Sequence, residues 1–570
     1  MTHARNLLVA SLLCVCVSSA PAAWRDPVRA PHAMVASTDR TASEVGAEVM
    51  KRGGNAVDAT VAVAFALAVT YPVAGNLGGG GFMMLRRSDG TVTAIDYRET
   101  APAAATRGMY LTPSGELIKG EGSSLVGYRA SGVPGTVAGM ALALKQHGSG
   151  KLTWAELIEP ARKLAADGFV VSYRTAQSLT ENQQMFSGYA DSRRIFLRDG
   201  KLYREGETLK QPELAATLAR LQKKGPREFY EGETARLIAE DMHRNGGTIT
   251  ADDLRGYTPK ERVPLRGSYR GHEIISMPPP SSGGAVLLEM LNILDGFDLK
   301  KLGPLSSENY HLLIETMRRA YADRAEYMGD ADFGSVPISG MIEKAYAERQ
   351  RGTIDPDRAS SSADIRAGKP AGTEPTETTH FTIVDAAGNA VSNTYTLNGA
   401  YGSGVVAKGT GVLLNNEMDD FTAKVGAPNM FGAIQSERNA IAPQKRPLSS
   451  MTPTFVLRPD GSLFFAVGTP GGTTIINTVL QVITNVIDHG MSLQEAIDAP
   501  RVHHQWLPDE VVTEPFGLSE DTKRALEARG HKISTKQRDM SDAQGVMIEE
   551  KPGVRLGASD SRRDGAAVGY

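Results

Sequence analysis

The spacing of apolar residues divides this chain into a helical first part and a strand-rich second part. Between residues 133 and 351, apolar positions recur every three to four residues, with charged residues on the opposite face. That period is typical of amphipathic helices that pack on a core. It predicts helices over residues 136–147, 154–166, 211–224, 231–244, 284–296 and 306–328.

Capping residues predict two earlier helices. Thr41 and Glu44 have the spacing of a capping box, so a helix should begin there and end at the glycine pair 53–54. Asn55 should cap the next helix. Residues 57–69 of that helix are apolar on nearly all sides, so we expect it to be buried.

A run of glycines at residues 78–81 leads into predicted strands over 82–87 and 91–97. A phosphate-binding loop would open a helix and usually carry a Lys-Ser/Thr pair. Neither is present, so the sequence does not indicate nucleotide binding. The glycines more readily permit a close approach of the backbone near a site.

Residues 352–377 interrupt the periodic pattern. They are rich in Pro, Gly, Ser, Thr and charge, which is typical of an exposed linker. A threonine-rich β pattern then begins, and it predicts a hairpin over residues 378–397. Helices should return over 473–488, 493–497 and 520–529. Helices on both sides of a strand-rich region predict an α+β fold with two sheets between helix layers.

The start of this hairpin could carry nucleophilic chemistry. A threonine hydroxyl is a poor nucleophile until a base removes its proton. If the chain were cut before Thr378, the new α-amino group, with a pKa of about 7.7–8.0, could act as that base from the same residue. The same segment is also compatible with an ordinary strand that opens with β-branched residues.

The first 22 residues have the pattern of a secretory signal peptide. Arg5 precedes an apolar run over residues 7–17, and small residues follow at 20–22. The run is too short to span a membrane, and no later stretch reaches 18 uninterrupted apolar residues. Cys14 and Cys16 would leave with the signal. We therefore expect an exported protein, periplasmic or secreted, without disulfides.

Composition argues against several kinds of partner. A formal net charge of −3 does not favour nucleic acid or an anionic membrane. His503 and His504 are adjacent, and neighbours on an extended chain point to opposite faces, so they do not readily share one metal ion. No cluster with metal-ligand spacing appears elsewhere. We expect neither a metal nor another cofactor.

An ordered set of short motifs resembles a known family. The motifs are GGNAVDA at 53–59, GGGGF at 78–82, DYRE at 96–99, YTLN at 395–398, NNEMDDF at 415–421, RPLSSMTPT at 446–454 and PGG at 470–472. None is decisive alone. As an ordered set they are specific, and the chain resembles the γ-glutamyltranspeptidases of the N-terminal-nucleophile hydrolase superfamily. The resemblance runs from about Ala36 to Tyr570.

The resemblance implies a four-layer αββα sandwich and an enzyme that cuts its own chain between Glu377 and Thr378. Residues 23–377 would form a large subunit, and residues 378–570 a small subunit of the same intertwined fold. Thr378 would accept the γ-glutamyl group of glutathione or a related compound as an ester. Water, or the amine of an amino acid or dipeptide, would then take up the group.

The resemblance also assigns residue roles. Thr396 would hydrogen-bond the hydroxyl of the nucleophile, and on a strand it would share a face with Asn398. The backbone N–H groups of Gly471 and Gly472 would form the oxyanion hole. An α-amino acid needs partners for both of its charges. These would be Arg98, Ser449 and Ser450 for the α-carboxylate and Asn398, Glu417 and Asp420 for the α-ammonium.

Two residues depart from the pattern of some bacterial members. Glu417 stands where some have Gln, so the ammonium would meet two carboxylates. Phe431 stands where well-known members have Tyr in a lid loop. The segment 421–445 is full length, so the lid should exist, but no hydroxyl from this position can latch it.

Three other functions remain open at this point. The same fold could serve a glutaryl or cephalosporin acylase, or a transpeptidase acting on poly-γ-glutamate. A glutaryl group has no ammonium, so an acylase would have little need for Glu417 and Asp420 together. A non-catalytic exported binding protein that keeps the fold is the third alternative, and the presence of Thr378, Thr396, Gly471 and Gly472 argues against it.

Overall fold

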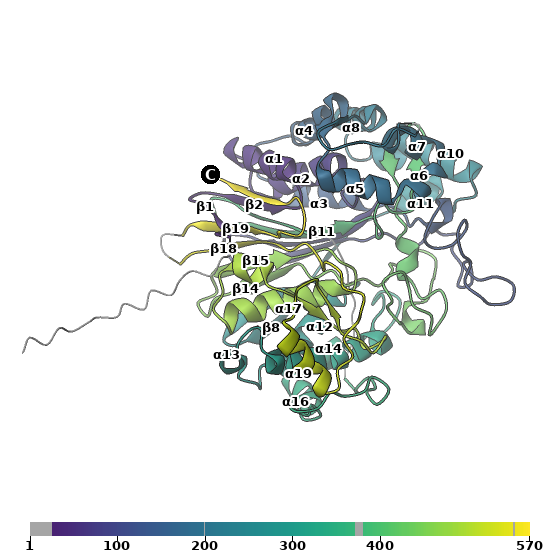
Figure 1. Ribbon diagram of the computed structural model, residues 1–570. Coiled ribbons are helices and arrows are strands. Elements are labelled where there is room, and N and C mark those ends of the chain that lie inside the picture. The colour runs from purple at the N-terminus through teal and green to yellow at the C-terminus, as the bar shows by residue number, and fades with distance from the viewer. Residues whose placement is uncertain (1–24, 199, 371–379, 551–552) are drawn as a thin grey trace, which may run out of the picture.

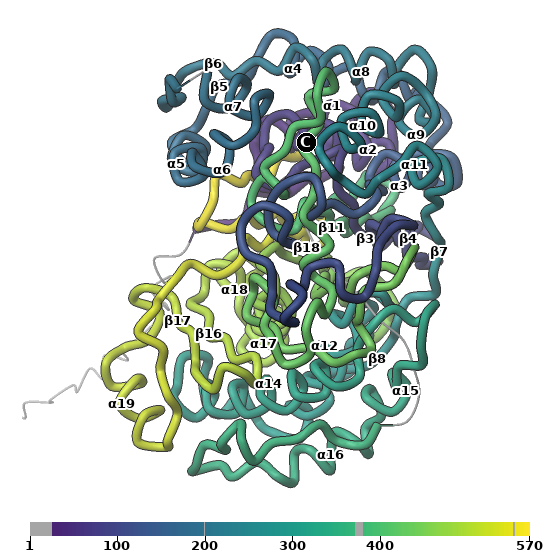
Figure 2. Tube along the Cα trace, turned by 90° about the vertical axis from the view of Figure 1, so that its right-hand side faces the viewer, coloured from purple at the N-terminus to yellow at the C-terminus, as the bar shows by residue number. Residues whose placement is uncertain are grey.

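The computed structural model describes residues 25–198, 200–370, 380–550 and 553–570. Two seven-stranded antiparallel sheets lie face to face between two layers of helices (Figure 1). Figure 2 shows the same helix layers after a quarter turn, with α4 and α8 at one end and α14 and α16 at the other. The predicted four-layer αββα sandwich is therefore confirmed.

The first sheet combines strands from both sides of residues 371–379. Its order is β20 (Ala566–Gly569), β2 (Met34–Ser37), β10 (Phe381–Val384), β11 (Ala390–Thr396), β3 (Gly80–Arg86), β4 (Val92–Tyr97) and β7 (Lys260–Arg262). The predicted hairpin is the β10–β11 pair, with Phe381 opposite Asn393. Strand β11 pairs with β3 along its whole length, which places Thr396, at the end of β11, opposite Gly80. The glycine run thus lies beside the end of the hairpin.

The second sheet includes strands that the sequence analysis missed. Its order is β1 (Val28–Ala30), β19 (Arg555–Ser559), β18 (Gln544–Ile548), β15 (Leu463–Gly468), β14 (Thr454–Leu457), β9 (His272–Ser276) and β8 (Leu265–Tyr269). The β8–β9 hairpin lies inside the segment predicted to be mostly helical. Its strands are short and partly exposed, so their apolar alternation is weak. The space between the sheets is filled by apolar side chains such as Phe82 and Phe455.

The predicted helices are present. They are α1 (Arg40–Lys51), α2 (Ala56–Thr70), α3 (Thr136–His147), α4 (Trp154–Asp167), α8 (Pro212–Lys224), α10 (Glu233–Arg244), α12 (Gly283–Leu294), α14 (Ser307–Tyr327), α17 (Thr474–Ile487), α18 (Leu493–Asp498) and α19 (Glu520–Ala528). Further helices not predicted include α5 (Tyr173–Glu181), α6 (Gln183–Ser187), α7 (Ala190–Phe196), α9 (Glu228–Glu231), α11 (Ala251–Gly256), α13 (Leu299–Leu302), α15 (Ile338–Met341) and α16 (Lys344–Arg351).

The caps of α1 and α2 give one correction and one confirmation. The cap of α1 is Asp39, whose carboxylate accepts the amide of Ala42 at 2.9 Å, so the capping box predicted at Thr41 is wrong. An aspartate directly before the first turn competes for the same role. Asn55 caps α2 as predicted, in a capping box with Asp58. No helix in the described part of the chain is long and apolar enough to cross a membrane.

The described part of the predicted linker, residues 352–370, runs along α14. Most of it is exposed, but Ile354 and Ser362 are buried. Arg319 donates to the carbonyl of Thr353 at 2.7 Å, and Asp323 accepts the amide of Gly368 at 2.6 Å. Buried charged residues of α14 therefore anchor this segment through hydrogen bonds to its backbone, although its sequence has no apolar periodicity.

Candidate active site

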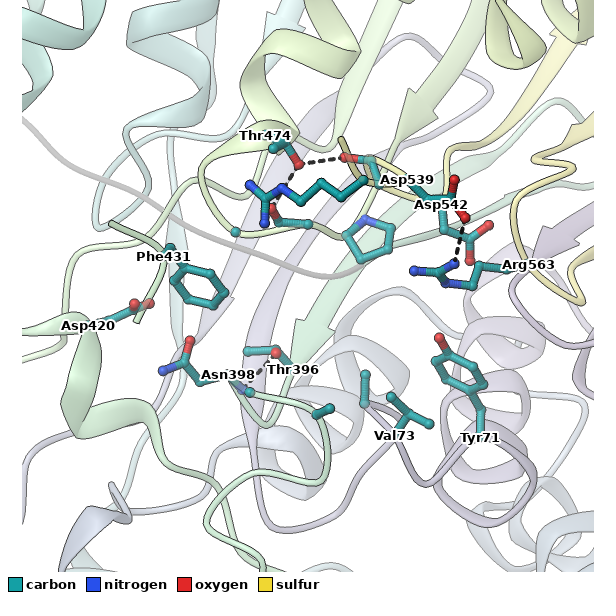
Figure 3. A pocket seen from close by; sticks show the side chains of 18 of the residues that line it. Tyr71, Val73, Thr396, Asn398, Asp420, Phe431, Thr474, Asp539, Asp542 and Arg563 are labelled. Carbon is teal, nitrogen blue, oxygen red and sulfur yellow. Dashed lines mark hydrogen bonds and ion pairs between the residues drawn. The ribbon is translucent and has the colours of Figure 1, made fainter. Parts of the chain in front are cut away.

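A cavity of about 460 Å³ opens where β11, the start of α17 and several loops meet (Figure 3). It brings together six of the predicted site residues: Thr396, Asn398, Glu417, Asp420, Gly471 and Gly472. Glu377 and Thr378, the predicted cleavage site and nucleophile, lie outside the described residues, as does the predicted signal peptide over residues 1–22.

Thr396 lies at the cavity because β11 ends there. Its hydroxyl accepts the backbone N–H of Asn398 at 2.8 Å. Asn398 has a φ of 74°, in the left-handed region that Asn tolerates better than most residues. Both side chains reach the cavity, but not because they share a strand face as predicted. Strand β11 ends at Thr396, and a tight turn brings Asn398 to the cavity. Asn76, which the sequence analysis missed, fixes this end by donating to the carbonyl of Thr396 at 2.8 Å.

Gly471 and Gly472 form a turn that only glycine fits well. Their φ angles are 136° and 59°. A Cβ on Gly471 would lie 2.5 Å from the Thr474 hydroxyl, and a Cβ on Gly472 would overlap the ring of Phe431. The turn leads directly into α17, so the N-terminal end of that helix faces the cavity. Backbone N–H groups at a helix N-terminus favour negative charge, as an oxyanion requires.

Arg98 is wholly buried beside the cavity and is surrounded by acids. Its guanidinium lies 2.6 Å from Asp420, forms an ion pair with Glu417 and lies 3.9 Å from Glu99. In the described structure, the residues predicted to bind opposite charges of one ligand thus contact each other. Glu417 and Asp420 are placed together by a single turn of 3-10 helix, Glu417–Asp420.

Burial favours the protonated form of the acids in this cluster. It raises the pKa of Glu417 well above its ordinary value, and the nearby Arg98 only partly opposes that rise. Burial likewise raises the pKa of Asp420, and that of Glu99 to about 7. One guanidinium among three buried carboxyl groups therefore leaves room for a second cation, because each carboxyl gains by having a positive partner.

Ser449 and Ser450 lie next to the cluster rather than on the wall of the described cavity. Their neighbour Leu448 offers its carbonyl to Arg98 at 3.4 Å. The Ser450 hydroxyl accepts from Arg324, a buried residue of α14, at 3.2 Å. Sequence analysis treated α14 as scaffold and missed Arg324. Its sequence neighbours include Asp323 and Glu326, so no local signal marks it as a buried charge that needs a partner.

The lid loop covers one end of the cavity, and charged residues line the other. Phe431, in the predicted lid segment, lies over Gly472. The far end carries residues that the sequence analysis missed, among them Tyr71, Asp539, Asp542 and Arg563. Asp539 and Arg563 lie 3.8 Å apart there (Figure 3).

The neighbouring histidines each have a different side-chain partner. Nδ1 of His503 lies 2.7 Å from Nδ2 of Asn477, whereas Nε2 of His504 lies 3.3 Å from Asp509. Their partners differ, as expected for adjacent residues on an extended chain. Among the described residues, no group of three or more His, Cys, Asp or Glu side chains is arranged to hold a metal ion.

Comparisons with known proteins agree on one family. A family model of gamma-glutamyltranspeptidase matches residues 42–570. The glutathione hydrolase proenzyme of Escherichia coli is 47% identical over 584 residues, which cover 100% of this chain and 99% of that protein.

Solved structures give the same answer. A cephalosporin acylase from Bacillus halodurans superposes with a TM-score of 0.85 at 27% identity, over 97% of this chain and 98% of its own. The gamma-glutamyltranspeptidase of Helicobacter pylori superposes with a TM-score of 0.57 at 47% identity, over 58% of this chain and 94% of its own. The chain described here belongs to the gamma-glutamyltranspeptidase family.

Proposed function

We propose that this protein is a self-processing γ-glutamyl transferase and hydrolase that acts on glutathione and related γ-glutamyl compounds. Membership of the family makes it an enzyme of this class. One observation carries the substrate assignment. One cavity joins a glycine turn suited to an oxyanion with the acids Glu417 and Asp420, and the buried Arg98 is paired with these acids directly behind the cavity wall. Groups of both charges are thus at hand for the α-carboxylate and α-ammonium of a glutamyl residue.

Substrate binding would exchange ion pairs within the cluster. The α-carboxylate would take over Arg98, and the α-ammonium would take its place beside Glu417 and Asp420. Each charge of the cluster then keeps a partner, so binding avoids the large cost of a buried charge left alone. Ser449 and Ser450, adjacent to Arg98 in the chain fold, would complete the carboxylate site, and Asn398 the ammonium site.

The chemistry would proceed through Thr378. In the precursor, its hydroxyl oxygen attacks the carbonyl carbon of Glu377, the C–N bond breaks, and the freed nitrogen becomes the α-amine of Thr378. Water then cleaves the resulting ester. In the mature enzyme that amine takes the hydroxyl proton as Thr378 attacks the γ-amide, and the leaving amine departs with a proton. Gly471 and Gly472 would stabilise the oxyanion in both reactions.

Cleavage at this bond would leave one fold. Residues 23–377 and 378–570 would be the large and small subunits. In the first sheet, β10 pairs with β2 and β11 pairs with β3. Each of these pairs joins one proposed subunit to the other, so backbone hydrogen bonds would hold the two together. We also propose that a signal peptide over residues 1–22 directs the protein to the periplasm or the outside of the cell.

An acylase function is the second candidate, because a cephalosporin acylase has the same fold. The paired acids Glu417 and Asp420 favour the γ-glutamyl reading, since a glutaryl group offers them no cation. The test compares hydrolysis of γ-glutamyl and glutaryl anilides by the purified protein, with and without a dipeptide acceptor. A denaturing gel of the same sample reports processing. Preference for the γ-glutamyl anilide and two bands are expected, whereas preference for the glutaryl anilide would overturn the proposal.

A further inference from the structure

The tip of the lid, residues 427–433, is bordered by cavities on several sides. Phe431 lines the active-site cavity. Asn429 and Met430 line a second cavity of about 260 Å³, and Phe431 and Gly432 line a third of about 240 Å³. A segment next to empty space makes fewer packing contacts than one in a filled core. Hydrogen bonds to the body of the protein therefore have a large share in holding this tip.

Asp419 makes one of these hydrogen bonds. Its Oδ2 accepts the backbone N–H of Met430 at 2.9 Å, and its Oδ1 accepts the hydroxyl of Ser124 at 2.6 Å. Its side chain is buried next to Asp420. Asp419 thus connects the lid backbone to the loop that carries Ser124, from the side of the acid cluster.

Gln505 makes another hydrogen bond from the opposite side, in addition to the one that Nδ2 of Asn429 donates to Asp420 at 3.2 Å. Its Nε2 donates to the carbonyl of Phe431 at 3.3 Å. Its Oε1 accepts the hydroxyl of Thr473 at 2.6 Å and lies 2.8 Å from Nε2 of His503. Thr473 directly follows Gly472, so Gln505 connects the lid to the glycine turn that Phe431 covers.

We infer that Asp419 and Gln505 are positioning residues that hold the lid closed by its backbone. This arrangement suits a chain whose Phe431 has no hydroxyl: the two ties use the Met430 amide and the Phe431 carbonyl, groups that any residue supplies. The inference rests on the proposed function, because the closed lid retains the γ-glutamyl donor. A lid that covers a bound substrate acts on its retention more than on the bond-making step.

The variants are chosen to break one tie at a time. Asp419→Ala removes the acceptor for Met430. Asp419→Asn should rescue it, because a flipped amide can present its oxygen to Met430 and its NH₂ to the Ser124 hydroxyl. Gln505→Glu keeps the acceptor for Thr473 but turns a carboxylate oxygen toward the Phe431 carbonyl. Asp521→Ala, at an exposed position of α19, is the matched control.

Hydrogen exchange of residues 427–433, measured by mass spectrometry, tests whether Asp419 and Gln505 hold the lid closed, and it needs no activity assay. Asp419→Ala and Gln505→Glu should each speed exchange across the whole tip, including the amides that Asn429 holds within it. Asp521→Ala should exchange like the parent, and Asp419→Asn should exchange no faster than the parent. The inference is overturned if Gln505→Glu leaves the tip unchanged, or if Asp419→Ala changes only the Met430 amide.

Kinetics with a γ-glutamyl anilide supply the second readout. Loss of one tie should raise the donor KM about three- to tenfold, the equivalent of one net hydrogen bond, with a smaller change in kcat. Equal falls in kcat and kcat/KM would contradict a positioning role. If the parent protein itself does not turn over the anilide, the proposed function fails, while the exchange comparison still decides the latch.

Discussion

Arg98 and Asp420 form a buried ion pair, with 2.6 Å between the guanidinium Nη2 and the carboxylate Oδ2. Asp420 also faces the cavity, whereas Arg98 lies behind it. The acid is thus the member of the pair that a ligand's ammonium reaches first. Arg98 can pair with the carboxylate of the ligand only when Asp420 pairs with the ammonium of the ligand instead of with Arg98.

Replacing Asp420 by Ala should therefore impair γ-glutamyl substrates strongly. Loss of one partner from a buried charge pair costs about 3–5 kcal/mol, or roughly two to four decades in kcat/KM. A glutaryl anilide has no ammonium and should lose far less, and processing should continue because Asp420 is not assigned to the Glu377 carbonyl. Steady-state kinetics on both anilides measure the difference, and equal losses would contradict the assignment.

Replacing Thr378 by Ala should leave one uncut chain of the precursor's length. The proposed mechanism requires the hydroxyl of this residue, and no other group supplies the attacking oxygen. The neighbouring Thr379→Ala is the matched control and should still be cut. Denaturing gels and intact-mass measurement report both results; cleavage of Thr378→Ala at the same bond would show that another nucleophile or a protease acts there.

Much of the scaffold could be predicted from the sequence, because amphipathic helices have a strong local period. Helix α3 (Thr136–His147) matches its predicted bounds, and α14 differs by one residue at each end. The β8–β9 hairpin could not be predicted in the same way. Its residues alternate weakly, and its position at the sheet edge depends on pairing with β14, nearly 180 residues later.

The site was predictable as a set of residues but not as an arrangement. The motifs identified Arg98, Glu417 and Asp420, but they did not predict that these side chains contact each other. Arg324 shows the limit most clearly. Its partner Ser450 is 126 residues away, so no local pattern distinguishes it from an exposed arginine on an ordinary helix. Contacts of this kind depend on tertiary packing.

Asp419 should make stability depend on pH. Burial raises the pKa of its carboxyl to about 6, and nearby Asp420 adds to the rise, while hydrogen bonds from Ser124 and Met430 oppose it. Tyr110, Lys119 and Lys424 line the adjoining cavity with it. The unfolded chain releases this proton near pH 4. Between about pH 4 and 6 the folded state holds more protons, so stability falls as pH rises through that window.

The uncut Thr378→Ala chain with and without Asp419→Asn isolates this contribution. The amide cannot ionise, so its stability relative to the parent should improve by up to about 3 kcal/mol between pH 4 and pH 7. Denaturant unfolding at several pH values gives the difference. If the difference in the free energy of unfolding between the two chains does not vary with pH, ionisation of Asp419 does not destabilise the fold and the prediction is wrong.

Gly472→Ala should reduce kcat. The residue has a φ of 59°, and a Cβ there would overlap the ring of Phe431, so the turn or the lid must shift. Displacing one oxyanion donor typically costs about 10²–10³ in kcat. Gly461→Ala is the control: it has a similar φ of 81°, but a Cβ there meets nothing within 4 Å. Equal activities of the two variants would exclude Gly472 from the oxyanion site.

Arg98→Lys should weaken binding of γ-glutamyl compounds while the nucleophile stays reactive. Arginine presents a planar fork that matches both oxygens of a carboxylate, and lysine cannot reproduce that geometry. Lysine keeps the positive charge beside Glu417 and Asp420, so the buried acids retain a cation and the fold should survive. Acylation of Thr378 by a small electrophile that lacks the α-amino acid group should continue at the parent rate.

The substrate supplies the second half of a double-mutant cycle. Converting its α-carboxylate to an amide removes the group that Arg98 is proposed to bind. That change should cost the parent enzyme much more than it costs Arg98→Lys, because the lysine variant has already lost the paired hydrogen bonds. The coupling energy follows from kcat/KM of the two enzymes on the two substrates. Additive losses would mean that Arg98 does not contact the carboxylate, and its role would then be limited to neutralising Glu417 and Asp420.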